Sequence, residues 1–115
     1  MSDNTYEYNE FDKVPRDIVC VRVVEGVKSI SDNAFEECRS LESITIPNSV
    51  TIIGNVAFCE CRNLVTMKIP SSVKEIEEFA FSGCKRLSNI DIPIGVRKIN
   101  LFTFEYCSTL KKIII

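Results

Sequence analysis

Cysteine is the residue type in this sequence with the clearest potential for chemistry. The chain has six Cys and no His, so it lacks the commonest metal ligand of proteins. Four of the cysteines recur at one constant interval: Cys38, Cys61, Cys84 and Cys107. A recurring position is typical of a repeat, and we expect these thiols to be reduced and buried as small apolar side chains. Cys20 and Cys59 lie outside the series, and their redox state is left open.

The spacing of the cysteines also argues against a metal centre. Cys59-Glu60-Cys61 is a C-x-C arrangement, whereas zinc sites use paired C-x-x-C segments or combine Cys with His. We therefore expect neither a bound metal nor a cofactor.

Adjacent acidic residues are the other candidates for catalysis. Glu36-Glu37 and Glu77-Glu78 each provide two carboxylates, but glycoside hydrolysis needs carboxyl groups that face each other across a pocket. The absence of His removes the commonest general base, and four Gly offer no Gly-rich phosphate loop. The sequence therefore predicts no catalytic residues and a protein that is not an enzyme.

Composition and charge narrow the classes of partner. The 115 residues include 14 Lys+Arg and 16 Asp+Glu, and 45% are apolar, as expected for one globular domain. A net charge of −2 gives no reason to expect nucleic-acid binding. The N-terminus lacks the basic and apolar regions of a signal peptide, and no apolar run approaches the roughly 20 residues of a membrane span. We expect a soluble, intracellular protein without direct membrane insertion.

The elements that would position these side chains repeat with the same period as the cysteine series. The recurring positions of one coil are Val50, Ile53, Phe58, Cys61, Leu64, Met67 and Ile69, and their counterparts lie one period before and after. One coil cannot bury its own apolar face, whereas stacked coils share a continuous core. We therefore predict a solenoid in which the Phe residues form an aromatic spine.

Each coil contains three kinds of segment. The unit L-x-x-I-x-I-P has the alternation of a strand, and it predicts strands over 19–23, 42–46, 65–69, 88–92 and 111–115. The V-x-x-I unit is a second short extended piece. The A-F-x-x-C-x-x-L unit has the spacing of a short α- or 3₁₀-helix, with Ser31 or Asp32 as the first N-cap. The sequence predicts an α/β solenoid of about four 23-residue coils, with a concave parallel β-sheet and short convex helices.

These motifs resemble the BspA-type leucine-rich repeat family, also called the Treponema pallidum type. The family pattern is close to L-x-x-I-x-I-P-x-x-V-x-x-I-x-x-x-A-F-x-x-C, and the second coil reads LESITIPNSVTIIGNVAFCEC. The resemblance covers residues 18–115, although the fourth coil departs from the pattern at Pro93-Ile94-Gly95 and at Thr103. It implies a leucine-rich repeat fold that binds rather than catalyses, since members occur in microbial surface adhesins and in intracellular proteins.

Side chains that alternate with the apolar strand positions are expected to line the concave face. We call these candidate protein-binding residues the outward strip: Arg22, Ser43, Thr45, Thr66, Lys68, Asn89, Asp91 and Lys112. They are small and mixed in charge and include none of the Trp or Tyr that often dominate interfaces, so an ordinary solvated face is the alternative.

The two ends of the stack form the remaining candidate surfaces. A solenoid must cover its core at each end, and residues 1–17 are either an N-terminal cap, through Tyr6, Tyr8, Phe11 and Val14, or an acidic tail. Residues 18–115 then form the solenoid. The last predicted strand ends without a polar cap at Ile113, Ile114 and Ile115, which we call the end-docking edge.

The sequence as a whole predicts a non-enzymatic module that binds another protein through a leucine-rich repeat scaffold. The first alternative is a structural subunit that docks on a larger assembly, or on a second copy of itself, through the end-docking edge. The second alternative is a repeat of a surface adhesin.

Overall fold

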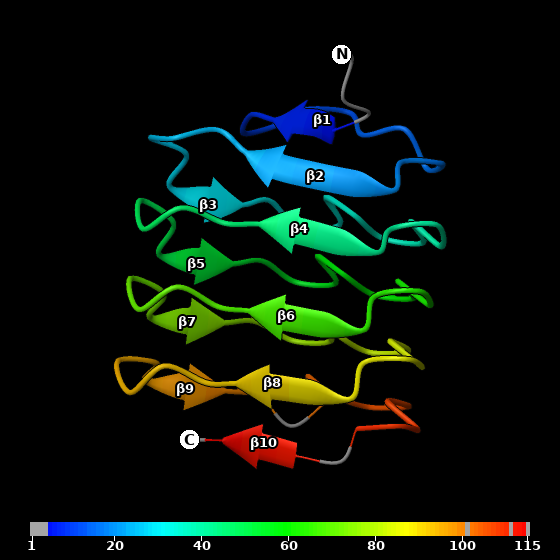
Figure 1. The fold of residues 1–115 in the computed structure, drawn as a ribbon. Coiled ribbons are helices and arrows are strands. Elements are labelled where there is room, and N and C mark those ends of the chain that lie inside the picture. The colour runs from blue at the N-terminus through cyan, green and yellow to red at the C-terminus, as the bar shows by residue number, and fades with distance from the viewer. Residues whose placement is uncertain (1–4, 101, 111, 115) are drawn as a thin grey trace.

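The computed structural model describes residues 5–100, 102–110 and 112–114, the last range for its backbone only. Within these residues the chain winds into a stack with two separate columns of strands (Figure 1). The first column contains β1 (Thr5–Tyr8), β2 (Cys20–Val23), β4 (Ser43–Thr45), β6 (Thr66–Lys68), β8 (Asn89–Asp91) and β10 (Lys112–Ile114). The second contains β3 (Ser29–Ile30), β5 (Ile52–Ile53), β7 (Glu75–Ile76) and β9 (Lys98–Ile99).

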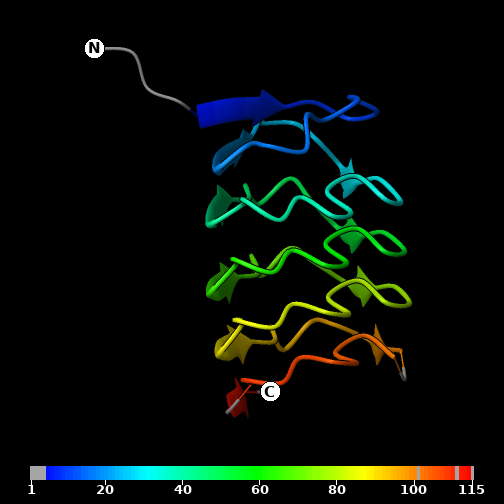
Figure 2. The ribbon, with the colours of Figure 1, turned by 90° about the vertical axis from the view of Figure 1, so that its right-hand side faces the viewer.

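All strand pairings are parallel, and within the repeat they join residues that are one period apart. In the second column Ile30 lies beside Ile53, which lies beside Ile76. In the first column β1, β2 and β4 form one sheet and β6, β8 and β10 form another. Viewed from the side, the two columns lie on opposite flanks of the stack (Figure 2). The predicted strands are confirmed in position, and β2, β4, β6 and β8 are each slightly shorter than their patterns.

The aromatic spine runs through the centre of the stack. Phe35, Phe58 and Phe81 are fully buried, with ring centroids 5.2 and 5.3 Å apart and nearly parallel planes. Phe104 extends the series at 5.7 Å from Phe81. Each of these rings therefore stacks on the equivalent ring of the next coil.

The predicted convex helices are wrong: the described residues contain no helix, and the A-F-x-x-C segments are successive tight turns. The backbone hydrogen bonds explain why. Alternate N–H groups donate to the next coil, in the pairs Asn33 to Asn55, Phe35 to Ala57 and Glu37 to Cys59. The N–H groups between them bond only three residues back, as in Glu36 to Asn33. Asp32 accordingly caps no helix and instead accepts the N–H of Asn55.

Left-handed backbone conformations at two positions of each coil produce this alternation. One series includes Asn33 at φ 63° and Val56 at φ 62°, and the other includes Glu37 at φ 60° and Glu60 at φ 62°. A residue with positive φ interrupts an α-helix, because L-residues in a right-handed helix have negative φ. The inter-coil hydrogen bonds stabilise these unfavourable conformations.

The count of four full coils is also corrected, to about three. Coils 27–46, 50–69 and 73–92 lie entirely within the described residues, and three successive pairings connect β3, β5, β7 and β9. The expected fourth coil, 96–115, includes positions 101, 111 and 115, which lie outside the described residues.

Residues before the first coil pack on its end. Strand β1 pairs with β2 in parallel, and the Tyr8 ring is fully buried, with its centroid 5.0 Å from that of Phe35. Tyr6 and Val14 are partly buried against the same core, whereas Phe11 is 84% exposed.

Candidate functional site

The outward strip lies on the first column of strands. Its seven side chains from β2, β4, β6 and β8 are all exposed: Arg22, Ser43, Thr45, Thr66, Lys68, Asn89 and Asp91. The alternation of the strands accounts for this, because the residues between them pack inward. Lys112 is in backbone register with Asn89, but its side chain lies outside the described residues.

Charges on the strip lie in neighbouring strands. Arg22 forms an ion pair with Glu7 of β1, and both side chains are more than half exposed. Lys68 stands in register with Asp91, so a cation and an anion lie side by side on β6 and β8. An exposed ion pair such as Arg22–Glu7 contributes little to stability. Lys68 and Asp91 are exposed, so their charges are accessible to a partner.

A groove of about 640 Å³ follows the carboxyl ends of β4, β6 and β8. Thr45, Lys68 and Asp91 of the outward strip line one part of it, and apolar side chains such as Ile44, Ile69 and Ile92 line another. A second hollow of about 400 Å³ continues from Thr45 towards Arg22 and Glu7. Thr45 lines both hollows, so they adjoin at this residue.

The groove coincides with an interruption of the first column. Strands β4 and β6 belong to different sheets, and Ile44 of β4 is only half-buried. Its counterparts Val21 and Met67 are buried. The repeat pattern did not predict this opening, because Ile44 matches the strand motif as well as its counterparts do.

The last coil is less covered than the central ones. Ile99 is 36% exposed while the equivalent Ile76 is fully buried, and Phe102 and Tyr106 are 40% and 70% exposed. The backbone of β10 pairs with β8. For the end-docking edge, the side chains of Ile113 and Ile114 and the whole of Ile115 lie outside the described residues.

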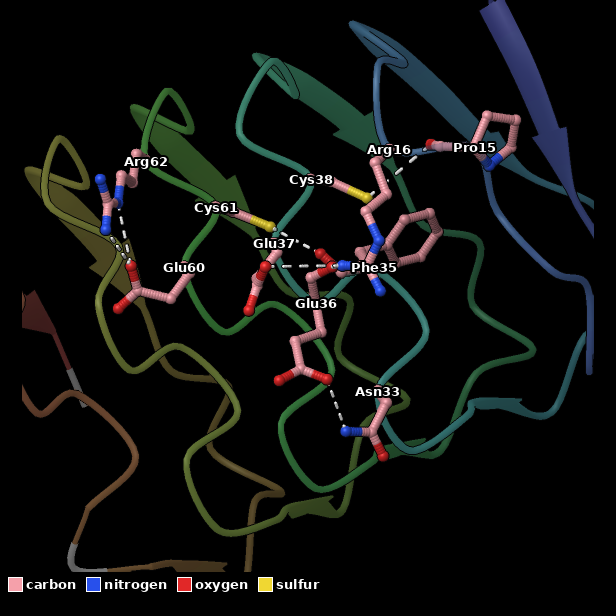
Figure 3. A network of polar contacts seen from close by, with 10 residues as sticks. All are labelled: Pro15, Arg16, Asn33, Phe35, Glu36, Glu37, Cys38, Glu60, Cys61 and Arg62. Carbon is pink, nitrogen blue, oxygen red and sulfur yellow. Dashed lines mark hydrogen bonds and ion pairs between the residues drawn. The ribbon is translucent and has the colours of Figure 1, made fainter.

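The cysteine series forms a ladder of hydrogen bonds inside the stack, the first rungs of which are drawn in Figure 3. The Cys61 thiol donates to the Phe35 carbonyl at 3.2 Å, and the Cys84 thiol donates to the Phe58 carbonyl at 3.1 Å. The Cys38 thiol lies 3.9 Å from the Pro15 carbonyl, so Pro15 replaces the missing Phe of a preceding coil. Burial raises the pKa of Cys61 and Cys84 well above the ordinary thiol range, which keeps these groups protonated.

The two cysteines outside the ladder are half-buried free thiols. Cys20 accepts a hydrogen bond from the Ser43 hydroxyl at 3.3 Å. Burial, and then the nearby Glu60 carboxylate, raises the pKa of Cys59. A raised pKa lowers the thiolate fraction on which cysteine nucleophilicity depends.

Of the acidic pair Glu36-Glu37, Glu36 lines a hollow of about 380 Å³ and Glu37 does not. Glu36 accepts the side-chain N–H of Asn33 at 2.8 Å, and Glu37 lies 4.0 Å from Arg16 (Figure 3). Desolvation, and then the charge of Glu75, raises the pKa of Glu77, whereas Glu78 is exposed. No cluster of three or more metal-ligating side chains occurs among the described residues. The same part of the chain contains no helical segment that could serve as a membrane span.

Comparison with known families identifies the repeat. Residues 25–115 match the family described as "BspA type Leucine rich repeat region (6 copies)". The chain belongs to the BspA-type leucine-rich repeat family. The L-x-x-I-x-I-P and A-F-x-x-C units are thus the coils of a BspA-type solenoid. A search of curated proteins found no match.

Solved structures of similar fold include bacterial leucine-rich repeat proteins. The T. pallidum leucine-rich repeat protein is 34% identical with a TM-score of 0.81, over 84% of this chain and 45% of that one. A protein from Bacteroides ovatus is 29% identical with a TM-score of 0.80, over 96% and 30% of the two chains. A cell surface protein from Faecalibacterium prausnitzii, at 24% identity and TM-score 0.74 over 89% and 34%, shares the fold. The chain therefore spans less than half the length of each of these proteins.

Proposed function

We propose that this BspA-type repeat is a non-enzymatic module that binds another protein through its outward strip. The observation that carries the proposal is the groove, in which strip residues Thr45, Lys68 and Asp91 stand beside apolar side chains of three successive coils. Extended surfaces that cross several coils are the ones that repeat proteins use for binding. Apolar side chains beside polar and charged ones suit a protein partner. The apolar part can bury apolar surface of the partner, and the polar groups can fix its orientation.

A selection from a displayed peptide library against the whole chain tests this proposal. We expect enriched binders to lose about tenfold or more in affinity for Lys68→Glu, because the inverted charge repels groups that lysine attracts. Lys98→Glu is the matched control, since it makes the same charge change at an exposed position of the second column. Thr45→Arg places a larger side chain where the groove adjoins the second hollow, and it should also abolish binding. Binders that are indifferent to Lys68→Glu and Thr45→Arg would refute the proposal.

A second candidate function is self-association or permanent docking through the end of the stack. The exposure of Ile99, Phe102 and Tyr106 in the last coil favours it. Light scattering across a dilution series with reductant should then give a mass above the 13.0 kDa of one chain. Ile99→Lys should reduce that mass, whereas Ile52→Lys, at a similarly exposed Ile of the second column, should not. A monomer at every concentration would contradict this candidate.

We also propose that residues 1–17 act as an N-terminal cap on a solenoid of residues 18–115. Support comes from the buried Tyr8 ring against Phe35 and from Arg16, whose guanidinium donates to the Glu36 carbonyl at 2.6 Å. The intracellular location stays a prediction.

A further inference from the structure

Phe11 is an exposed aromatic residue in an unfavourable backbone conformation. Its side chain is 84% exposed, and its φ of 69° lies in the left-handed region. Asn33, Glu37, Val56 and Glu60 also have positive φ, but each donates its N–H to the next coil, whereas Phe11 precedes the repeat. Bulky residues are rare in this region. Neither burial nor backbone preference therefore accounts for Phe at this position.

Hydrogen bonds on both sides hold the turn that carries Phe11. The Asp12 N–H donates to the Asn9 carbonyl at 3.2 Å, and the Asp12 carboxylate accepts the Asn9 N–H at 2.9 Å. The Glu10 carboxylate accepts the N–H of Lys28 and the hydroxyl of Ser29, both at 3.1 Å. The Phe11 ring is thus presented from a fixed backbone rather than from a loose segment.

A hollow of about 430 Å³ lies beside the ring, between the N-terminal turn and the second column of strands. Phe11 and Ile52, which is 37% exposed, provide its apolar walls. Asp32 is the one charged residue among its lining residues, all of which the structure describes. Its Oδ1 accepts the Asn55 N–H at 2.8 Å, so the carboxylate is held in place. Gly54 permits this close approach, since a Cβ there would lie 2.5 Å from Oδ1.

Phe11 and Asp32 also line a neighbouring hollow of about 380 Å³, which contains Lys13 and Arg16 in addition. Arg16 is engaged by the Glu36 carbonyl. Neither cation lines the hollow bounded by Ile52. That hollow therefore combines an aromatic face, a carboxylate and an aliphatic wall, with Glu10 adding a second negative charge at its edge.

We propose that this hollow receives an arginine side chain of a partner protein. The guanidinium would stack on the Phe11 ring and pair with the Asp32 carboxylate, while its methylene stem would lie on Ile52. Arginine fits better than lysine, because its planar, weakly hydrated guanidinium stacks on aromatic faces and bonds carboxylates in a fork geometry. The site lies on the opposite flank from the groove of the outward strip, so it is independent of the binding function proposed above.

A titration of the full chain with N-acetyl-L-argininamide, followed by amide chemical shifts, tests the inference. We expect saturable shifts at Ser29, Asp32 and Gly54. The blocked citrulline analogue has nearly the same shape without the charge. We expect its affinity to be at least about fivefold lower than that of the arginine probe. Equal shifts with citrulline, or no saturable shift up to the solubility limit of the arginine probe, would overturn the proposal.

Two variants separate recognition from folding. Asp32→Asn keeps the Oδ1 acceptor for Asn55 but removes the charge, and Phe11→Gly suits the positive φ but removes the ring. Each should weaken arginine binding about two- to fivefold, without lowering the denaturation midpoint. Asp91→Asn and Ile94→Gly are the controls, with the same kinds of change at exposed positions elsewhere, and they should leave binding unchanged. Unaltered binding by Phe11→Gly would also refute the assignment.

Discussion

Replacing Phe58 by Ala removes the central ring of the aromatic spine. Phe58 is fully buried and stacks on Phe35 at 5.2 Å and on Phe81 at 5.3 Å. Because it is enclosed on all sides, its removal leaves a cavity in the core. A buried Phe→Ala change costs about 3–5 kcal/mol, and the loss of two stacked pairs places this case at the upper end, about 4–5 kcal/mol. A chain of this length has a total stability of about 6–17 kcal/mol. The single substitution therefore removes a large fraction of it.

Urea denaturation followed by circular dichroism measures this cost. With a denaturant slope of about 2 kcal/mol/M, the midpoint should fall by about 2 M. The matched control is Phe102→Ala, the same chemical change at a ring that is 40% exposed and stacks on one neighbour, Phe79, at 5.2 Å. We expect it to cost about 1–2 kcal/mol. A Phe58→Ala cost below about 1 kcal/mol, or one equal to that of Phe102→Ala, would refute the idea that the stacked rings hold the coils together.

Two further predictions concern the thiol ladder and the outward strip. Burial raises the pKa of Cys61 and Cys84, so in the folded state they keep protons that the unfolded chain releases near the ordinary thiol pKa of 9.0. Their stabilising contribution is thus complete below that pH and is lost as pH rises above it, by about 1.4 kcal/mol per pH unit and thiol. Denaturation midpoints measured between about pH 9 and 10.5 should show this fall in the free energy of unfolding. Cys61→Ala should make the fall with pH shallower by the contribution of one thiol. An unchanged slope in the variant would contradict a raised pKa for the buried Cys61 thiol. Thr45→Ala should alter the free energy of unfolding by less than about 0.5 kcal/mol, because its side chain is exposed, and a larger loss in the same assay would mean that this strip position is structural.

The repeat and its strands could be predicted from the sequence because they depend on local alternation and a fixed period. Ile30, Ile53 and Ile76 recur at that period and lie side by side in the structure. The exposure of the strip residues of β2, β4, β6 and β8 follows from the same alternation. Their membership of a binding site remains a proposal.

The helices were wrongly predicted because apolar spacing does not report where backbone N–H groups bond. The spacing of Phe35, Cys38 and Leu41 suits one face of a helix equally well. In the stack, however, Phe35 donates its N–H to Ala57 of the next coil at 2.7 Å. That competing acceptor exists only after neighbouring coils have packed, so no single coil carries the signal.

The sequence by itself determined which side chains form the core, because burying apolar surface depends on residue type and periodicity, and both are visible in the chain. It also determined that equivalent residues stack in register. The tertiary structure alone decided the turn conformations, the opening beside Ile44 and the hollow beside Phe11. These features depend on inter-coil hydrogen bonds and on the distance between non-adjacent segments. They arise from several coils and the N-terminal turn together, and no repeat motif encodes them.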